Sequence, residues 1–242
     1  MIETSGNGDD RVIARALTYS LAENVERLSS NKDGVSRTLT SNSGGASLVG
    51  NSAADIFYGQ GGDDLQYGGL GNDTLTGRGG EDTLRGRSGA DIQYGGLGDD
   101  FLDGQGDADV RDLLYGGGGD DTLVFNNNDT VFGGTGDNTF GFNGDETGTL
   151  TNGEVVALVD IEGFFGVTGQ SVLAFASGLE TGTFTYVDSA TFSGDGNSEA
   201  RFNETLFQVE VDSDGDGTID MAFRLSGMTA ASQLSTDDFD WV

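Results

Sequence analysis

Six consecutive nonamers fill residues 50–103: GNSAADIFY, GQGGDDLQY, GGLGNDTLT, GRGGEDTLR, GRSGADIQY and GGLGDDFLD. A seventh repeat, GQGDADVRDLLY from Gly104, carries three extra residues, and an eighth, GGGGDDTLV, begins at Gly116. Two degenerate copies, NNNDTVF and GGTGDNTFG, continue the pattern to Gly141. Glycine supplies 21 of the 70 residues from Gly50 to Gly119, which excludes a chance periodicity.

Each position of the repeat has a physical task. Glycine permits backbone angles with positive φ and lets neighbouring loops approach closely. The last three residues tend to be apolar or β-forming, which is enough for one short strand. A six-residue turn followed by a three-residue strand buries nothing alone, whereas stacked repeats bury a continuous core. The sixth position is aspartate in all eight repeats: Asp55, Asp64, Asp73, Asp82, Asp91, Asp100, Asp109 and Asp121.

A disordered acidic linker is the common interpretation of a stretch rich in Gly and Asp. The fixed phase of the aspartates and the strand residues that follow them argue against it. The nonamers instead resemble the GGxGxDxUx repeat of the repeats-in-toxin (RTX) family. This resemblance implies a parallel β-roll in which two nonamers make one coil, so that strands two repeats apart lie side by side. It also implies several calcium ions between stacked loops, held by backbone carbonyls of the turns and by the Asp carboxylates.

The resemblance also assigns the ligands. Its spacing pairs Asp55 with Asp73, Asp64 with Asp82, Asp73 with Asp91, Asp82 with Asp100 and Asp91 with Asp109, while Asp121 follows Asp100 after the insertion. The remaining ligands that it implies are turn residues: Gly59, Gly61, Gly62, Gly68, Leu70, Gly71, Gly77, Gly79, Gly80, Gly86, Ser88, Gly89, Gly95, Leu97 and Gly98.

Calcium also suits the chemistry of these turns. It is a hard cation that takes about six to eight oxygen ligands, and the turns offer only oxygens, whereas magnesium demands a tighter octahedron and keeps its waters. Three departures weaken the ends of the roll: Ala53 and Asp107 replace the fourth-position Gly, and Asn138 replaces the sixth-position Asp. We therefore expect weak ion binding, or none, at both ends.

The eighth position of each repeat is expected to point into the roll. The residues that fit this interpretation are Phe57, Leu75, Leu84, Leu102 and Leu123. Gln66 and Gln93 do not fit, and each is flanked by apolar or aromatic residues, which leaves the local packing open.

The two flanks have other patterns. The segment from Gly8 to Leu28 resembles a linking unit found between roll segments of long RTX proteins, and we expect residues 1–49 to form two or three strands that cap the roll. Because such a unit normally lies within a chain, its place directly after Met1 suggests a piece of a longer protein. Residues 50–141 form the roll. Residues 142–242 show alternating apolar patterns at 155–159, 172–175, 183–187, 206–211 and 218–225, which predict an antiparallel β cap domain.

The C-terminal region contains Glu199-Ala-Arg-Phe-Asn203, the acidic segment from Val209 to Asp220, and Asp237-Asp-Phe-Asp-Trp-Val242. This pattern resembles the C-terminal domain of serralysin-type secreted proteins, in which the uncleaved C-terminus is the type I secretion signal. Its Asp212-x-Asp214-x-Asp216-Gly217 also copies the first half of an EF-hand loop. The second half fails, because Phe223 stands where a bidentate Glu is expected. The alternative interpretation is a polar hairpin turn between two strands.

Composition removes several classes of protein. The chain has no Pro, Cys or His, so a collagen, a disulfide scaffold, a Cys/His zinc site and a histidine base are excluded. Its formal charge of −30 would repel the phosphates of a nucleic acid. Neither a signal peptide nor an apolar run of membrane-spanning length is present in these 242 residues. A carboxylate pair could serve a hydrolase, but the repeats account for most acids, and we expect no enzyme.

The sequence therefore predicts an all-β calcium-binding protein: a parallel β-roll of glycine-rich nonapeptide repeats with a C-terminal antiparallel β cap. The expected function is folding on extracellular calcium, which supports the type I secretion and stability of a bacterial exoprotein that is secreted or held at the cell surface. The alternative is a stand-alone surface or matrix protein that binds polysaccharide or a cell-surface partner. Its candidate ligand residues are Tyr58, Tyr94 and Tyr115, which end repeats on one side of the roll.

Overall fold

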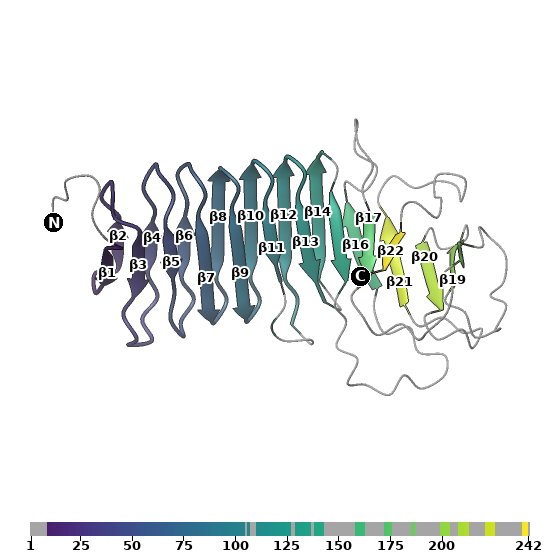
Figure 1. Cartoon of the computed structure of the whole chain (residues 1–242). Helices are drawn as coiled ribbons and strands as arrows, with labels where there is room; N and C mark the ends of the chain where they lie inside the picture. The colour runs from purple at the N-terminus through teal and green to yellow at the C-terminus, as the bar shows by residue number, and fades with distance from the viewer. Residues whose placement is uncertain are drawn as a thin grey trace.

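The computed structural model describes residues 9–104, 106, 110–126, 129–136 and 138–142, together with the strands β16 to β22 beyond them. The strands follow one another along a single axis that starts at the N-terminal end (Figure 1). The chain alternates between two sheets, which lie back to back as a two-sided solenoid. The predicted parallel β-roll is confirmed.

One sheet has ten strands and is built from the odd-numbered strands up to β17, with β22 at its end. Its members are β1 (Arg11–Ala14), β3 (Arg27–Ser30), β5 (Ser47–Val49), β7 (Leu65–Leu70), β9 (Thr83–Ser88), β11 (Phe101–Asp103), β13 (Thr122–Phe125), β15 (Thr139–Phe142), β17 (Val172–Phe175) and β22 (Phe239–Trp241).

The other sheet has twelve strands and contains the even-numbered strands up to β16, followed by strands of the C-terminal region. Its members are β2 (Thr18–Ser20), β4 (Thr38–Thr40), β6 (Ile56–Tyr58), β8 (Thr74–Gly79), β10 (Ile92–Leu97), β12 (Leu113–Gly118), β14 (Thr130–Thr135), β16 (Leu158–Glu162), β21 (Met221–Leu225), β20 (Gln208–Asp212), β19 (Glu199–Asn203) and β18 (Thr185–Tyr186).

The register follows the sequence period. Phe57 of β6 pairs with Leu75 of β8, and Leu102 of β11 pairs with Leu84 of β9, each two repeats away. The apolar side chains at this position are fully buried and form one continuous core between the sheets, as predicted. Gln66 and Gln93 point inward too, because each donates a hydrogen bond from Nε2 to a backbone carbonyl of the facing sheet, Thr76 at 2.9 Å and Asp103 at 2.7 Å.

Many strands are longer than the three residues that the repeat predicts. Strands such as β7 and β8 have six residues, because the first three positions of the next nonamer continue the strand. The turn shrinks to the three residues that end in the aspartate. Its first residue is a left-handed glycine, for example Gly71 at φ 101°, where a Cβ would lie 2.8 Å from the carbonyl carbon of Ala53.

The solenoid begins before the predicted boundary at Gly50. The segment predicted to cap the roll contributes β1 to β5, and these strands pair in parallel with one another and with β6 and β7. Leu28, Leu39 and Leu48 take the inward position there and are fully buried. The same coiling is therefore built without the glycine period.

The coiling also continues beyond the repeats. Strands β16 and β17 pair in parallel with β14 and β15, and β21 and β22 extend the two sheets in the same sense. Antiparallel pairing occurs between β19, β20 and β21. The predicted cap domain as a whole remains a prediction. The described residues contain no helix long and apolar enough to cross a membrane.

Candidate metal centre

A row of buried aspartates follows each edge of the solenoid, one residue before each strand. We call these residues the carboxylate ladder: Asp55, Asp64, Asp73, Asp82, Asp91, Asp100, Asp112, Asp121 and Asp129. The backbone N–H of each donates to Oδ1 of the aspartate one coil later, at 2.6–2.9 Å from Asp55 through Asp112. Each side chain is at most 3% exposed. The ladder therefore links successive coils through Oδ1 alone.

The second oxygen of four ladder aspartates lacks a hydrogen-bond partner. Oδ2 of Asp73, Asp82, Asp100 and Asp121 is buried and accepts no hydrogen bond. Burying an ionised oxygen without a partner costs free energy, because its hydrogen bonds to water are lost on folding and no protein hydrogen bond replaces them. These four oxygen atoms therefore need a hydrogen-bond donor or a cation that the described residues do not supply.

Each of these oxygens lies beside the first glycine of its own repeat. A Cβ at Gly68, Gly77, Gly95 or Gly116 would lie closer than 3.0 Å both to the neighbouring Oδ2 and to a carbonyl oxygen of the next coil. Those carbonyls belong to Gly86, Gly95, Gly116 and Gly133. The register of strand pairing skips these glycines, so their carbonyls stand outside the regular pairing. A carboxylate oxygen and a carbonyl oxygen thus converge on the same glycine in successive coils.

The donor set of this cradle consists of oxygens. Among the described residues, no three acidic side chains gather to hold a metal, so an ion here would take backbone carbonyls as well as carboxylates. Such a set suits a hard cation, and calcium tolerates the mixed, flexible coordination that a repeating backbone offers. The orphaned Oδ2 atoms and the glycine cradle therefore fit the ion that the sequence predicts.

Burial also changes the acidity of the ladder. Loss of solvent, reinforced by the charges of neighbouring carboxylates, raises the pKa of Asp73 to about 8 and the pKa values of Asp82 and Asp100 to about 7. The same desolvation raises the pKa of Asp121 to about 6. Without a cation, several carboxyl groups would hold a proton near neutral pH, and a bound cation would displace it.

The ends of the ladder are satisfied by the chain itself. Asp55 accepts backbone N–H groups on both oxygens, from Arg37 at 2.6 Å and Asn51 at 2.9 Å. Asp129 does the same with Asp112 at 2.8 Å and Asn126 at 2.7 Å. Neither has the orphaned oxygen of the middle aspartates.

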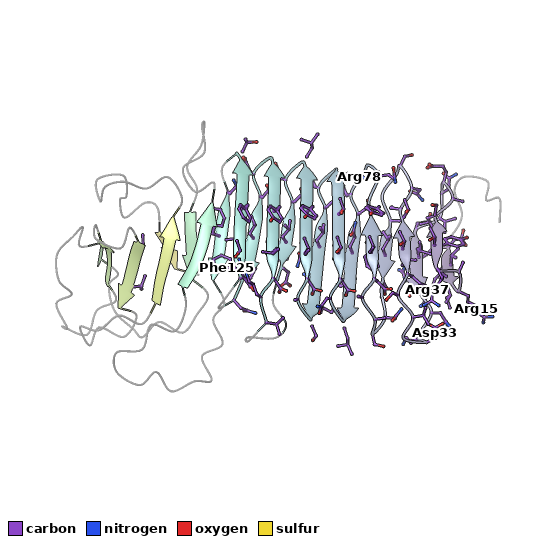
Figure 2. All side chains as sticks on the ribbon, turned by 180° about the vertical axis from the view of Figure 1, so that it is seen from behind. Arg15, Asp33, Arg37, Arg78 and Phe125 are labelled. Atoms are coloured by element: carbon purple, nitrogen blue, oxygen red, sulfur yellow. The ribbon has the colours of Figure 1, made fainter. Side chains whose placement is uncertain are left out.

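One coil before Asp55 and Asp64, the ladder position is taken by Arg37 and Ala46. The Arg37 guanidinium is buried and binds both carboxylate oxygens of Asp33 at 2.7 Å (Figure 2). It also donates to the carbonyl of Val35 at 2.8 Å. This hydrogen-bonded pair holds the pKa of Asp33 below its usual range. The chain supplies its own cation where the ladder ends.

The insertion in the seventh repeat lies before the ladder residue. Asp91 donates to Asp112, which replaces the predicted partner Asp109, and Asp109 lies outside the described residues. Asp112 directly precedes the strand residues of β12, as every other ladder aspartate precedes its strand. The place directly before a strand would have identified both Asp112 and Asp129 from the sequence. The search for aspartates at the sixth position of each nonamer missed them.

The carbonyl ligands predicted from the turns fall into three groups. First-position carbonyls such as Gly77, Gly86 and Gly95 reach the cradle, as Gly116 and Gly133 do without having been predicted. The third-position carbonyl of Leu97 instead accepts the N–H of Gly80 at 3.0 Å, because this part of the turn has become strand. The fourth-position glycines, from Gly62 to Gly98, hold the left-handed angle of the turn.

The other predicted sites are only partly described. Asp212 is the last residue of β20, while Asp214 and Asp216 lie outside the described residues. Tyr58, Tyr94 and Tyr115 all lie on the twelve-stranded sheet. Tyr115 stacks on Tyr94 at 4.9 Å between ring centroids and on Phe132 at 4.4 Å. The ring faces thus cover one another.

Residues 40–147 match a family model described as the RTX calcium-binding nonapeptide repeat (4 copies), in the overlapping segments 40–75, 67–102, 76–110, 111–127 and 124–147. The curated proteins and the solved structures give no match to this chain. The repeats are thus of the RTX type, which supports calcium as the ion of the cradle. The serralysin-like character of the C-terminal region stays a prediction.

Proposed function

We propose that this chain is a calcium-binding RTX module that completes its folding when it meets extracellular calcium. The observation that carries the proposal is the set of buried Oδ2 atoms of Asp73, Asp82, Asp100 and Asp121, each without a hydrogen bond and each beside a carbonyl of the next coil. Bound calcium would supply the positive charge and the coordination that these oxygens lack. The remaining parts of the site are provided by residues of the chain itself.

The residues of the chain prepare the site and delay folding until the ion arrives. The ladder fixes Oδ1 through the backbone of the preceding coil, so Oδ2 is held in place and cannot turn to solvent. The first-position glycines let Oδ2 and the carbonyl oxygen approach the same point of the backbone, where any Cβ would collide with both. Without the ion, buried like charges and the entropy of ordering a glycine-rich chain both oppose folding. Metal binding is then part of the folding free energy.

This coupling suits a secreted protein. At cytosolic calcium the repeats would stay unfolded and could pass a type I secretion channel, and outside the cell they would fold at dissociation constants on the order of 10⁻⁴–10⁻³ M. We propose this role, with a place outside the cell or on its surface, and no catalytic activity of its own. The match to calcium-binding RTX repeats and the acid-rich, His-free composition support it.

The direct test compares two adjacent aspartates. Asp99→Asn and Asp100→Asn remove the same charge, but Asp99 is exposed and Asp100 is buried in the ladder. Far-UV circular dichroism is followed while calcium rises from none to about 10 mM, above the range of extracellular sites, with magnesium as the control ion. We expect a cooperative gain of β signal with calcium alone, unchanged by Asp99→Asn.

Asp100→Asn is expected to need about tenfold more calcium, because one charged ligand is lost. In the absence of calcium the same variant should be more stable than the natural chain, because the amide carries no buried charge. A β spectrum that is complete without calcium, or equal shifts for the two variants, would contradict the proposal.

A further inference from the structure

A groove crosses the outer face of the ten-stranded sheet where β5, β7 and β9 lie side by side. Its volume is about 670 Å³, and the side chains that matter for a ligand are those of Lys32, Val49, Tyr67, Leu70, Arg87 and Ser88. It borders the N-terminal end of the carboxylate ladder, where the backbone N–H of its lining residue Asn51 donates to Oδ2 of Asp55 at 2.9 Å. The four aspartates with an unpartnered Oδ2 do not line it.

The groove is cationic on a strongly acidic chain. It is lined by Lys32 and Arg87 and by no acidic residue, although acidic residues outnumber basic ones 41 to 11 in the sequence. Within the described part of the chain, neither cation forms an ion pair, whereas Arg27, Arg37 and Arg85 do. Two uncompensated cations in a concave surface favour an anionic ligand.

Arg87 occupies a backbone conformation that favours glycine. Its φ is 76°. Arg87 is the second residue of its nonamer, a position that glycine occupies in several other repeats, for example Gly69 at φ 121° and Gly96 at φ 129°. A residue with a Cβ is strained there. The guanidinium of Arg87 lies over the Tyr67 ring, 5.0 Å from its centroid.

Arg78 provides the comparison on the facing sheet. It has the same repeat position, the same left-handed angle (φ 81°) and the same placement over a tyrosine, 5.5 Å from the Tyr58 centroid. Its guanidinium, however, donates to Oε1 of Gln60 at 3.0 Å, and it does not line the groove. Arg78 is therefore a chemical and conformational match for Arg87 without the groove.

The other lining residues indicate the chemistry of the uncharged part of the ligand. Val49 and Leu70 are exposed to solvent, Leu70 at 56%, and they flank Tyr67. Ser52 and Ser88 also line the groove. A surface of apolar patches, an aromatic ring, hydroxyls and cations complements a molecule with apolar ring faces, many hydroxyls and negative charge. A sugar that carries a carboxylate has this combination.

We propose that this groove binds a carboxylate-bearing oligosaccharide, with Lys32 and Arg87 on its carboxylates and the exposed side chains of Val49 and Leu70 against its rings. The anionic charge distinguishes this ligand from a neutral glycan, which would gain nothing from the two cations. The stacked tyrosines of the twelve-stranded sheet play no part in it.

The experiment uses the full chain in calcium, after circular dichroism has shown each protein to be folded, so that a failure to fold on calcium is recognised separately. Titration calorimetry measures the binding of trigalacturonic acid, with cellotriose as the neutral control. Arg87→Gly and Arg78→Gly are the matched variants, because each removes a guanidinium and relieves the same backbone strain. Both variants should fold at least as stably as the natural chain.

We expect trigalacturonic acid to bind and cellotriose to bind at least about tenfold more weakly, because a charge-assisted contact is lost. Arg87→Gly should lose about tenfold in affinity for the acid, and Arg78→Gly should keep it. Equal affinities of the natural chain and Arg87→Gly would overturn the proposal, as would equal losses in the two variants. The absence of binding to the folded natural chain, or Arg87-dependent binding only to vesicles of anionic phospholipid, would overturn it too.

Discussion

The N-terminal coils (residues 11–49) and the repeat coils (residues 50–125) share one geometry but treat their buried polar groups in opposite ways. In the N-terminal coils the chain provides most of the partners. The Arg37 guanidinium binds Asp33 through both terminal nitrogens, although its Nε is left without an acceptor. Buried Asn42 donates to the carbonyls of Ala22 and Val25, both at 2.9 Å, and accepts from Gly44 at 3.1 Å. In the repeat coils, Oδ2 of Asp73, Asp82, Asp100 and Asp121 has no donor.

The difference separates what makes a coil from what makes it depend on an ion. Parallel pairing and the inward apolar ladder are common to both regions, so neither the glycine period nor calcium is needed for the geometry. In the repeats, the aspartates keep an Oδ2 atom without a hydrogen bond, and the first-position glycines let a backbone carbonyl oxygen approach the same place. Dependence on a cation is thus a property of particular residues laid over a general architecture.

Filling the cradle should have the largest effect. In Gly77→Ala the new methyl group would clash with Oδ2 of Asp82 and with the carbonyl oxygen of Gly95. We expect a loss of about 3 kcal/mol in unfolding free energy in saturating calcium, since overpacking and the loss of an ion add. Gly61→Ala is the control, because its methyl group would meet nothing closer than 3.8 Å. Chemical denaturation measures both variants, and equal losses would show that the cradle has no special role.

Acidity should separate the ion-free protein from the loaded one. The folded pKa values of Asp73, Asp82, Asp100 and Asp121 lie above the ordinary value of 3.8, so the folded ion-free chain holds protons that the unfolded chain releases. Its stability is therefore greatest below about pH 4 and falls as pH rises toward 8. We expect demetallated protein to be more stable at pH 5 than at pH 8 by at least about 2 kcal/mol.

Calcium should reverse this dependence, because protons compete with the ion for the same carboxylates. Calcium affinity is therefore expected to fall on acidification from pH 8 to pH 5. Thermal unfolding at both pH values, with and without calcium, checks the pair of statements. Ion-free stability that rises with pH would show that the ladder carboxyl groups are not desolvated as the structure places them.

A smaller effect, independent of calcium, is expected in the N-terminal coils. Asn42→Ala leaves the carbonyls of Ala22 and Val25 without their donor, which costs about 1.5 kcal/mol. Amide exchange over residues 38–49 should accelerate about tenfold, equally with calcium and without it. Asn72→Ala, in an exposed turn of the repeats, should change stability by less than about 0.5 kcal/mol. A calcium-dependent effect of Asn42→Ala would blur the distinction between the two regions.

The period of the sequence is enough to predict the parallel coils, the sheet that each strand joins and the inward residues. These features follow from local spacing, since a repeat of nine residues places Leu75 and Leu84 at the same position of successive strands. The aspartate phase likewise places most of the ladder. The spacing of residues along the chain does not predict features that depend on contacts between neighbouring strands.

Three particulars depend on those neighbours. The six-residue strands include glycines of low β propensity, which pair because a parallel neighbour is already in place. The coils before Gly50 lack the period, and only the buried leucines reveal their register. Buried Gln66 and Gln93 find carbonyl acceptors on the facing sheet, a contact that no pattern in the chain announces. Asp112 is different, because its place directly before a strand was visible in the sequence.

We propose that the repeat coils need a cation to fold and that the N-terminal coils do not. Hydrogen exchange with mass spectrometry, on the same protein with calcium and after demetallation at pH 8, tests it region by region. The account predicts that calcium slows amide exchange over residues 65–118 by about 100-fold, the effect of ligand at about 100 times its dissociation constant, and over residues 18–49 by only a few-fold. Equal slowing in the two regions, or none in the repeats, would contradict it.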